Sequence, residues 1–242
     1  MLPIFVINLD RSEGRLKKAS TQLDNLGIKF ERISAVDGRA ISREELYKHY
    51  CIEQNKQKYH RALTPGEIAC YLSHRKAWQQ IVERALPAAI ILEDDFLIES
   101  GLENILALVA SNRKFDYVKL ANQLGRPRKT KVLEMVGSGE LVAFKKVPAQ
   151  TCAQLVSLNG AKRLLEFSDR FYRPIDVDLQ HWWEINIEII GLQPFPFSHT
   201  HDIKSDICDT SKRNLQKKRR LNRIFQQISF KINNSIKPKK RY

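Results

Sequence analysis

The sequence has few of the features that mark secreted, membrane-spanning or zinc-binding proteins. No apolar run approaches the ~20 residues needed to cross a bilayer. The four cysteines are scattered without a C-x-x-C pair, which favours reduced cytosolic thiols over a disulfide framework or zinc site (Cys51, Cys70, Cys152 and Cys208). Residues 1–11 lack a basic leader and a small-residue cleavage site, so we expect a first strand there and not a signal peptide.

Glycine-rich phosphate motifs are also missing. The sequence contains neither a G-x-G-x-x-G fingerprint nor a Walker P-loop, which excludes the common dinucleotide-binding and NTPase motifs. There is no internal repeat and no low-complexity linker before residue 210. Any nucleotide would therefore have to be bound by a different arrangement of side chains.

Acidic residues are absent from residues 210–242, which hold twelve lysines and arginines. Taking these 12 from the 41 basic residues leaves 29 against 27 acidic ones, so the net charge of +14 resides mostly in this tail. We therefore predict two units, a catalytic domain over residues 1–209 and a basic tail over residues 210–242.

Within the tail, apolar residues recur at helical spacing: Leu221, Ile224, Phe225, Ile228 and Ile232. This pattern predicts an amphipathic helix on an anionic membrane surface. A nucleic-acid-binding tail and a disordered solubility tail remain alternatives. Nucleic acid is the less favoured partner, because the body shows no basic patch interleaved with aromatic residues.

Strand and helix patterns alternate along the body, which predicts a three-layer α/β domain with a mostly parallel central sheet flanked by helices. Helix starts are indicated at Ser12 and Ser42, and most clearly at Thr64-Pro65-Gly66-Glu67, a capping box with proline at the first helical position. Strands are expected over residues 2–9, 28–35, 89–92, 116–120, 141–147, 151–157 and 187–192, and later helices over 159–167 and 176–184.

The strand over residues 89–92 runs directly into three acids, Glu93, Asp94 and Asp95. Buried carboxylates need a positive partner, because an isolated one would cost several kcal/mol or take up a proton. On an extended strand Glu93 and Asp95 point the same way, so both could be ligands of one Mg²⁺ or Mn²⁺ that arrives with a phosphorylated ligand at the carboxyl edge of the sheet. The alternative is a plain acidic strand end capped by a lysine or arginine from a neighbouring loop.

Polar residues also follow the first two predicted strands. Asn8, Asp10, Arg11 and Arg15 lie at the first strand-to-helix turn, where helix amides and arginines suit a nucleotide or diphosphate. The Asp37-Gly38 pair ends the second strand, where an acid commonly binds a ribose hydroxyl. A solvated helix start explains the first group about equally well, and a plain Asp-Gly turn is a common competing explanation for the second.

Late in the chain, two further groups of residues suit catalysis. Asp176 or Asp178 could act as a general base, although Asp176 also fits a helix N-cap. His199 and His201 lie in a loop followed by an acid, and either could add a ligand to the same metal.

These segments together resemble glycosyltransferase family 25, the bacterial lipooligosaccharide galactosyl- and glucosyltransferase group, over roughly residues 1–207. The carriers are Val6-Ile7-Asn8-Leu9-Asp10-Arg11 with Arg15, Ala35-Val36-Asp37-Gly38, Leu63-Thr64-Pro65-Gly66-Glu67-Ile68-Ala69-Cys70-Tyr71-Leu72-Ser73-His74 with Ala77-Trp78, Ile91-Leu92-Glu93-Asp94-Asp95, Asn159-Gly160-Ala161 and Pro174-Ile175-Asp176. The Gly-Glu-x-(Ala/Gly)-Cys-x-x-Ser-His run followed by Leu-Glu-Asp-Asp is the most specific of them.

The resemblance implies a GT-A-type nucleotide-sugar-binding fold in which Glu93-Asp94-Asp95 is a variant of the Asp-x-Asp motif. Asp95 would contact the metal, while Glu93 and Asp94 would contact the ribose or metal-bound water. Ser73 and His74 would line the donor pocket. Gln154 stands where many members have tyrosine, and His201 (or His199) matches a third metal ligand only loosely.

The implied reaction is metal-dependent, inverting transfer of a hexose from a UDP-sugar to the core of lipooligosaccharide or lipopolysaccharide. Galactose is favoured, as in a β-galactosyltransferase, and glucose is the alternative. Asp176 is favoured over Asp178 as the base, with Asp94 a second catalytic candidate. The enzyme would be cytoplasmic and peripheral on the cytoplasmic face of the bacterial inner membrane. The alternatives are a metal-dependent nucleotidyltransferase or phosphohydrolase, and a basic-tailed nucleic-acid-binding protein.

Overall fold

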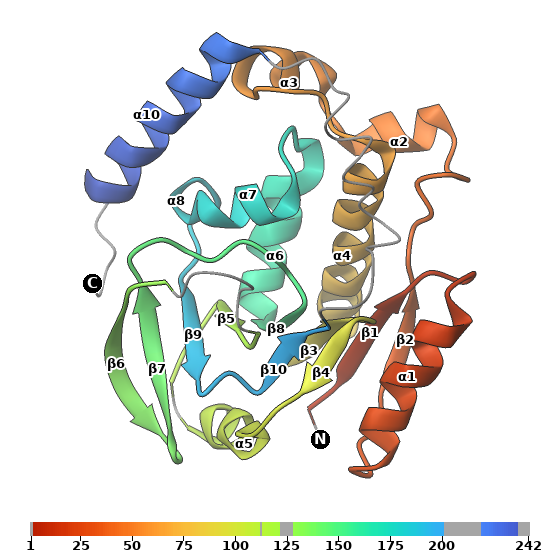
Figure 1. Ribbon diagram of the computed structural model, residues 1–242, viewed down its shortest axis with the longest axis vertical. Helices are drawn as coiled ribbons and strands as arrows, with labels where there is room; N and C mark the ends of the chain where they lie inside the picture. Colours follow the sequence, from red (N-terminus) through yellow and green to blue (C-terminus); the bar gives the residue numbers. More distant parts are fainter. Residues whose placement is uncertain (1, 112, 122–127, 201–218, 237–242) are drawn as a thin grey trace.

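An eight-stranded sheet forms the centre of the protein (Figure 1), in a computed structural model that describes residues 2–111, 113–121, 128–200 and 219–236. Its order is β2-β1-β3-β8-β5-β9-β7-β6, and a separate two-stranded ribbon pairs β4 with β10. The strands are β1 Ile4–Asn8, β2 Glu31–Ser34, β3 Ala88–Glu93, β4 Phe96–Ile98, β5 Tyr117–Lys119, β6 Thr130–Val136, β7 Gly139–Phe144, β8 Ala153–Ser157, β9 Ile189–Gln193 and β10 Phe197–His199.

Most strands of the large sheet run in one direction, which confirms the predicted α/β class. β1 pairs in parallel with β2 and β3, and β5 pairs in parallel with β9. β8 runs opposite to its neighbours β3 and β5, and β7 runs opposite to β9 and β6. The carboxyl ends of β1, β2, β3 and β5 therefore meet at one edge of the sheet, together with the start of β8.

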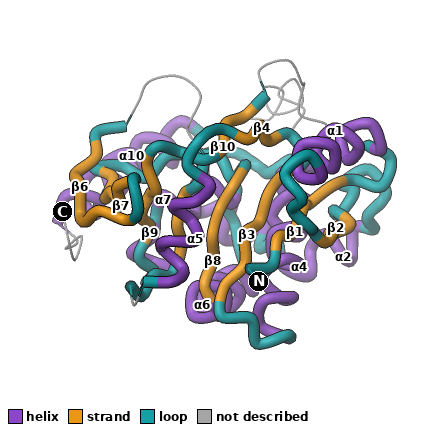
Figure 2. Tube along the Cα trace, turned by 90° about the horizontal axis from the view of Figure 1, so that it is seen from below, coloured by secondary structure: helices purple, strands orange, loops and turns teal. Residues whose placement is uncertain are grey.

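Helices cover both faces of the sheet, and each strand alternates its side chains between two apolar clusters. Phe5 and Ile91 lie in the cluster under α4 and α6, whereas Val6 and Leu92 lie in the cluster under α1 and α5. Figure 2 shows α1 and α6 on opposite sides of the sheet. The helices are α1 Glu13–Asp24, α2 Arg43–His49, α3 Ile52–Lys58, α4 Pro65–Glu83, α5 Leu102–Ala110, α6 Leu158–Phe167, α7 Ile175–Gln180, α8 Trp182–Ile185 and α10 Arg220–Ile236, with a 3₁₀ turn at Ser168–Arg170.

Helix α4 begins with the predicted capping box. The Thr64 side chain accepts a hydrogen bond from the backbone N–H of Glu67, whose carboxylate accepts one from the backbone N–H of Thr64. Arg61 adds a bidentate, buried ion pair to the same carboxylate. These contacts fix the start of the long buried helix that carries Ser73 and His74.

The helix expected over residues 176–184 is two short helices, α7 and α8, which meet at His181. Pro174, and not Asp176, occupies the N-cap of α7, so the N-cap alternative for Asp176 was wrong. Strand β6 was not predicted, because it lies at the sheet edge and much of its length is exposed.

The expected tail helix is present as α10, and it lies against the body at α3 (Figure 1). Arg219 donates to the carbonyls of Asn55 and Tyr59, and Asn222 donates to three carbonyls at the end of α3. The predicted boundary at residues 209 and 210 lies outside the described residues. No helix in the described part of the chain combines the length and hydropathy needed to cross a membrane.

Farther along α10, the Phe230 ring packs against His181 and Trp183 at centroid distances of 5.0 and 5.5 Å. His181 is 6% exposed, and one ring nitrogen bonds to the carbonyl of Val177 at 2.8 Å. Burial lowers the pKa of His181 to about 4, so the folded protein holds this ring neutral at a pH where the unfolded chain protonates it.

We therefore expect part of the stability to be lost as the pH falls from about 6.5 towards 4, because the unfolded state then binds one proton more than the folded state. His181→Asn keeps a donor for Val177 and should abolish about 2 kcal/mol of the difference in unfolding free energy between pH 7 and pH 4.5. Urea unfolding of both proteins at the two pH values measures this difference. Equal pH dependence in the two proteins would contradict it.

Candidate active site

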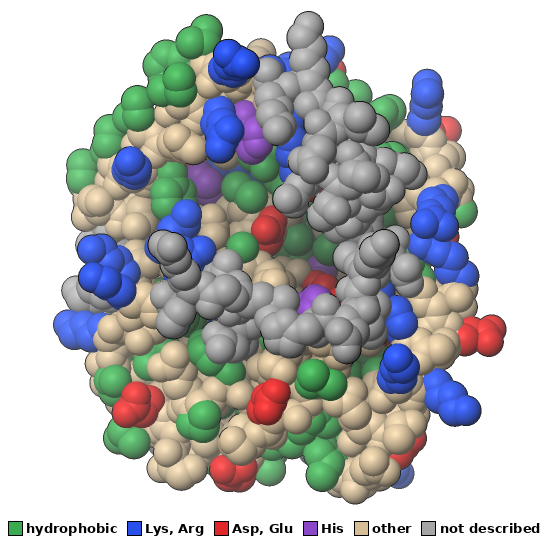
Figure 3. All heavy atoms as spheres, viewed as in Figure 1, with side chains coloured by type: hydrophobic (Ala, Val, Ile, Leu, Met, Phe, Trp, Pro, Cys, Tyr) green, Lys and Arg blue, Asp and Glu red, His purple; other side chains and the backbone are tan. Residues whose placement is uncertain are grey.

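Five polar side chains converge on the carboxyl edge of the sheet because of the strand directions described above. Asn8 ends β1, Glu93 ends β3 and Lys119 ends β5. Thr151 precedes the antiparallel β8, and β10 brings His199 alongside Phe96, the residue after Asp95. On the face seen in Figure 3, acidic and histidine side chains lie set back near the middle of the molecule.

Glu93 points toward α4, continuing the alternation of β3. Its carboxylate lies 3.0 Å from Nε2 of His74 and accepts a short hydrogen bond from Thr151. Burial acts to raise the pKa of Glu93, but the bonds from His74 and Thr151 outweigh it and leave the pKa below its ordinary value. The other ring nitrogen of His74 lies 3.0 Å from the amide of Gln154, so the histidine is held in place on both sides.

Asp94 points the other way, toward α1, and both of its oxygens are engaged. One lies 2.7 Å from Nη2 of Arg15, and the other accepts a 2.6 Å hydrogen bond from Asn8. Burial raises the pKa of Asp94 to about 6, although Arg15 and Asn8 act in the opposite direction. This arrangement ties β3 to the first strand-to-helix turn, and the catalytic role expected for Asp94 stays a prediction.

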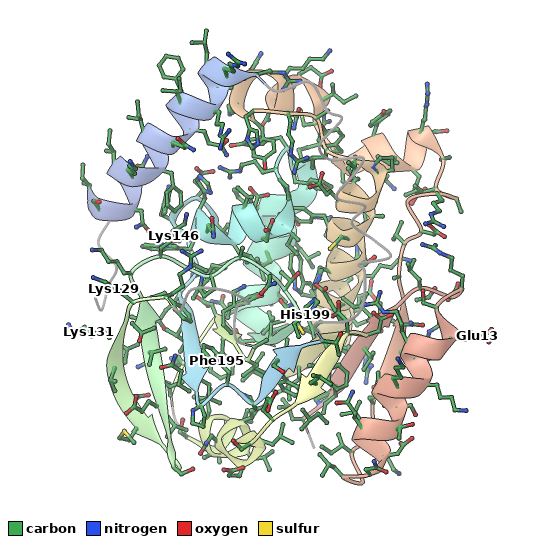
Figure 4. The ribbon with its side chains drawn as sticks, viewed as in Figure 1. Glu13, Lys129, Lys131, Lys146, Phe195 and His199 are labelled. Atoms are coloured by element: carbon green, nitrogen blue, oxygen red, sulfur yellow. The ribbon has the colours of Figure 1, made fainter. Side chains whose placement is uncertain are left out.

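Asp95 is 4% exposed and has one engaged and one unengaged oxygen. Its Oδ2 lies 2.9 Å from Nε2 of His199 and 3.1 Å from Nη2 of Arg15. Its Oδ1 is buried and has no hydrogen-bond partner among the described residues. The hydrogen bond to Asp95 is the main reason why the pKa of His199 is raised to about 9. Figure 4 shows the position of His199 on β10.

Both interpretations of the acidic strand end can be weighed against this geometry. Arg15 supplies the capping cation that the simpler one requires, and together with Asn8 it satisfies both oxygens of Asp94. The Arg15 cap does not account for the buried Oδ1 of Asp95, because a buried carboxylate oxygen without a hydrogen-bond partner costs free energy. A carboxylate oxygen suits Mn²⁺ or Mg²⁺, so Asp95 is the residue that would hold the metal. His199 would join it only by giving up a proton and its present contact with Asp95.

A second group that could hold a metal lies behind the strand end. Ligand atoms of Cys70, His74 and Glu93 lie within 4.8 Å of one another. A thiolate, an imidazole and a carboxylate together suit zinc better than a hard, oxygen-seeking cation. In this structure one ring nitrogen of His74 bonds to Glu93 and the other lies beside Gln154, so the group holds the Glu93 carboxylate in place.

The residues expected to bind a nucleotide lie together, but several are paired with one another. Arg11 forms an ion pair with Asp37, which joins the turns after β1 and β2. Asp10 bonds to Arg32 and Ser34 of β2 and not to the acidic strand end. The expected arginine contacts to a diphosphate would therefore require these pairs to rearrange.

Gly38 is needed at the turn after β2 for steric reasons. A Cβ at this position would lie 2.6 Å from the carbonyl oxygen of Pro65, at the start of α4. Ser73, near the middle of α4, accepts a hydrogen bond from the backbone N–H of Val36 at 2.9 Å. Ser73 and His74 are buried and support the strand ends from behind, and their expected place in the donor pocket stays a prediction.

The two candidate bases differ sharply. Asp178 is 1% exposed and is bound by Arg173 at 2.5 Å and by the Tyr71 hydroxyl at 3.0 Å, so it stabilises the fold and is shielded from an acceptor. Asp176 is partly exposed and lines a cavity of about 400 Å³. This contrast supports the preference for Asp176.

Sequence reasoning missed Lys119 and Thr151 and only loosely assigned His199. Lys119 is buried, and its ammonium donates a hydrogen bond to the carbonyl of Gln150. Burial lowers the pKa of Lys119 to about 8, although the charges of Asp176 and Glu93 act to raise it. The position of Lys119, a single lysine at the end of an apolar strand, could have identified it from the sequence. The favoured metal ligand, His201, lies outside the described residues.

A family model for glycosyltransferase family 25 (LPS biosynthesis protein) matches residues 1–179. The chain belongs to glycosyltransferase family 25. That match contains the carboxyl ends of β1, β2, β3 and β5 as well as Asp176, but not β10, which carries His199. It therefore confirms the family resemblance, whereas the individual roles of the site residues stay predictions.

Several curated relatives come from animals. A "Glycosyltransferase 25 family member" of Drosophila melanogaster is 32% identical over 170 residues, which are 67% of this chain and 27% of the relative. "Procollagen galactosyltransferase 1" of Danio rerio is 28% identical over 82% of this chain and 36% of the relative. A "Probable inactive glycosyltransferase 25 family member 3" of Bos taurus is also 28% identical, over the same 82% and 36%. This family 25 chain thus spans about a quarter to two fifths of their length.

Among solved structures, a glycosyltransferase involved in glycosylation of the major capsid of PBCV-1 has a TM-score of 0.47 at 10% identity. The alignment covers 84% of this chain and 94% of that structure.

The metal assignment makes a direct prediction for Mn²⁺ alone. If Asp95 holds the ion, Mn²⁺ at a hundred times its dissociation constant should add about 2.7 kcal/mol to the unfolding free energy of the wild type. Asp95→Asn should lose this stabilisation, because the amide is a far weaker ligand than the carboxylate. Thermal unfolding with and without Mn²⁺ measures it.

Glu99→Gln is the matched control, because it makes the same change of charge at a carboxylate on the β4–β10 side of the edge, where Glu99 bonds to Ser198. It should respond to Mn²⁺ as the wild type does. If Mn²⁺ stabilises Asp95→Asn as much as it stabilises the wild type, Asp95 does not hold the ion, and the acidic strand end is explained by its ion pairs with Arg15 alone.

Proposed function

We propose that this protein is an inverting, metal-assisted glycosyltransferase that moves a hexose from a UDP-sugar to the core of lipooligosaccharide or lipopolysaccharide. The observation that carries the proposal is the buried carboxylate of Asp95 at the carboxyl edge of the sheet in a family 25 chain. Its Oδ2 lies beside His199, whereas its Oδ1 has no hydrogen-bond partner among the described residues. Membership of family 25 also favours sugar transfer over phosphate chemistry or nucleic-acid binding.

In an inverting transfer, an acceptor hydroxyl attacks the anomeric carbon on the face opposite the leaving UDP. The bond to UDP breaks as the new glycosidic bond forms, and a base on the acceptor side takes the hydroxyl proton. Asp176 suits this role because it is partly exposed and lines a cavity, whereas Asp178 is held by Arg173 and Tyr71.

The metal, when bound by Asp95, would supply Lewis-acid stabilisation to the negative charge of the leaving diphosphate. Around that site, His74 and Thr151 hold the Glu93 carboxylate in one orientation. Arg15 and Asn8 hold Asp94, so the backbone before Asp95 is fixed as well. The site is therefore organised in advance of substrate binding.

The proposed substrates rest on names within the family. The family description refers to LPS biosynthesis, and one relative is named as a galactosyltransferase, which favours galactose over glucose. Relatives named as inactive also occur, so a measurement of transfer is essential.

A cytoplasmic-leaflet location is part of the proposal, and α10 supports it. Its outward face is an apolar stripe, and Leu221, Phe225 and Ile228 in it are 70%, 69% and 50% exposed. Figure 3 shows apolar side chains along the outer edge where α10 runs, with basic side chains beside them. Lys129, Lys131 and Lys146 lie near the far end of the helix (Figure 4). Such a stripe with a basic rim fits the surface of an anionic membrane.

The donor and the base are tested together. Thermal unfolding with UDP, UDP-galactose, UDP-glucose, GDP-mannose and ATP, each with and without Mn²⁺, should show Mn²⁺-dependent stabilisation by the uridine nucleotides only. Asp176→Asn should keep that stabilisation and lower kcat for transfer by about 100-fold or more, because the amide cannot take the proton.

Asp169→Asn is the control for the base, because it makes the same change at an exposed carboxylate, 72% accessible. It should transfer sugar at the wild-type rate. Unchanged turnover in Asp176→Asn would remove Asp176 from the mechanism, and the absence of any nucleotide response would remove the proposed function.

The membrane assignment predicts that Phe225→Ser with Ile228→Ser weakens binding to phosphatidylglycerol-containing vesicles by about tenfold or more, because each buried apolar side chain contributes about 1.5–3 kcal/mol. Vesicle co-sedimentation of the full chain measures the affinity. Leu106→Ser, at a position 63% exposed on α5, is the control and should bind as the wild type does. Equal binding by the double variant would refute the role of the stripe.

A further inference from the structure

A cavity of about 400 Å³ lies between the inner face of α10, the segment that joins α3 to α4, and the start of α7. Its volume falls within the range of small-molecule sites, roughly 300–1,000 Å³. Most of the residues that line it are polar, and they include Tyr59, His60, Asp176, Arg223, Gln226 and Gln227. No part of this cavity coincides with the metal-binding residues at the end of β3.

The wall that α10 contributes follows from the periodicity of the helix. Arg223, Gln226 and Gln227 are spaced three and four residues apart, so they share one face. That face lies opposite the exposed apolar stripe. The helix therefore presents amide and guanidinium groups to the cavity and apolar groups to the outside.

The cavity is fixed by contacts on each side. Gln226 lies 3.1 Å from Nδ1 of His60, which joins α10 to the segment before α4. The buried Arg61–Glu67 ion pair belongs to the opposite wall, where it is locked into the α4 capping box. Arg219 anchors the first turn of α10 to α3. The position of α10 is therefore set by specific bonds to the body.

Asp176 connects this cavity to the acidic strand end. Its charge acts on Tyr59, another residue of the cavity, and on Lys119 at the end of β5. Lys119 in turn interacts electrostatically with Glu93. Asp176 therefore belongs to the cavity and is near enough to Lys119, at the carboxyl edge of the sheet, for their charges to interact, as a base acting on an acceptor beside that edge requires.

We propose that this cavity is the acceptor subsite, in which a pyranose of the acceptor lies with one hydroxyl toward Asp176 and α10 contributes Arg223, Gln226 and Gln227 as ligands. The proposal rests on the function proposed above and deepens it. Amide, imidazole and guanidinium groups both donate and accept hydrogen bonds, as a ring with several hydroxyls requires. The basic tail then has two roles, since its outer face meets the membrane and its inner face binds the sugar.

The test uses the full chain and a soluble probe, the core oligosaccharide released from lipid A, so that membrane binding does not contribute. Titration calorimetry without donor should show binding to the wild type. Gln227→Ala and Arg223→Ala should each weaken it by about fivefold or more, the effect of losing a hydrogen bond. Ser229→Ala, an exposed position on the same helix that is outside the cavity lining, should bind normally.

Kinetics then separate this proposal from the proposed function. In Gln227→Ala the KM for the oligosaccharide should rise about fivefold, while the Mn²⁺-dependent stabilisation by UDP stays that of the wild type. Wild-type affinity in both cavity variants, or no oligosaccharide binding by the wild type, would overturn the subsite. Loss of oligosaccharide binding in the variants, with no response of the wild type to UDP, would retain the sugar site and remove the proposed donor.

Discussion

The interaction on which the rest of this site depends is the pairing of Arg15 with Asp94 and Asp95. Two adjacent carboxylates, each less than a tenth exposed, cannot both remain ionised at the end of a buried strand without a cation nearby. Arg15 supplies it from α1, so the first strand-to-helix unit must dock where β3 ends. Removing one partner from such a pair leaves an uncompensated buried charge, which typically costs about 3–5 kcal/mol.

The three acids that follow the apolar part of β3 point in different directions and have different partners. Glu93 turns toward α4, where His74 and Thr151 hold it, and Asp94 turns toward α1, where Arg15 and Asn8 hold it. Asp95 lies past the strand, and the β4–β10 ribbon brings His199 beside it. Two acids are thus used to fix the third, which is the arrangement that leaves a single carboxylate oxygen available for a ligand.

The parts of this site that the sequence predicts are those fixed by local chemistry. The capping box at Thr64 and the buried strand ending in acids needed only neighbouring residues to be recognised. Thr151 could not be found this way, because it reaches Glu93 only through the antiparallel direction of β8. His199 reaches Asp95 only through the pairing of β10 with β4, across about a hundred residues of chain. Strand direction and ribbon pairing are long-range properties that periodicity does not contain.

The C-terminal helix α10 is a second example of what the sequence does not predict. Helical spacing of Leu221, Phe225 and Ile228 predicts a helix with one apolar face, but not which face meets the body. In a typical surface helix the apolar face would turn inward. Here Arg219, Asn222 and Gln226 hold the polar face inward through hydrogen bonds to α3 and to the segment after it, and the apolar face remains outside. A helix that exposes its apolar side while bonding to the body by its polar side needs a second, apolar surface to cover it. The anionic membrane proposed above would cover it and would also attract the basic residues around the stripe.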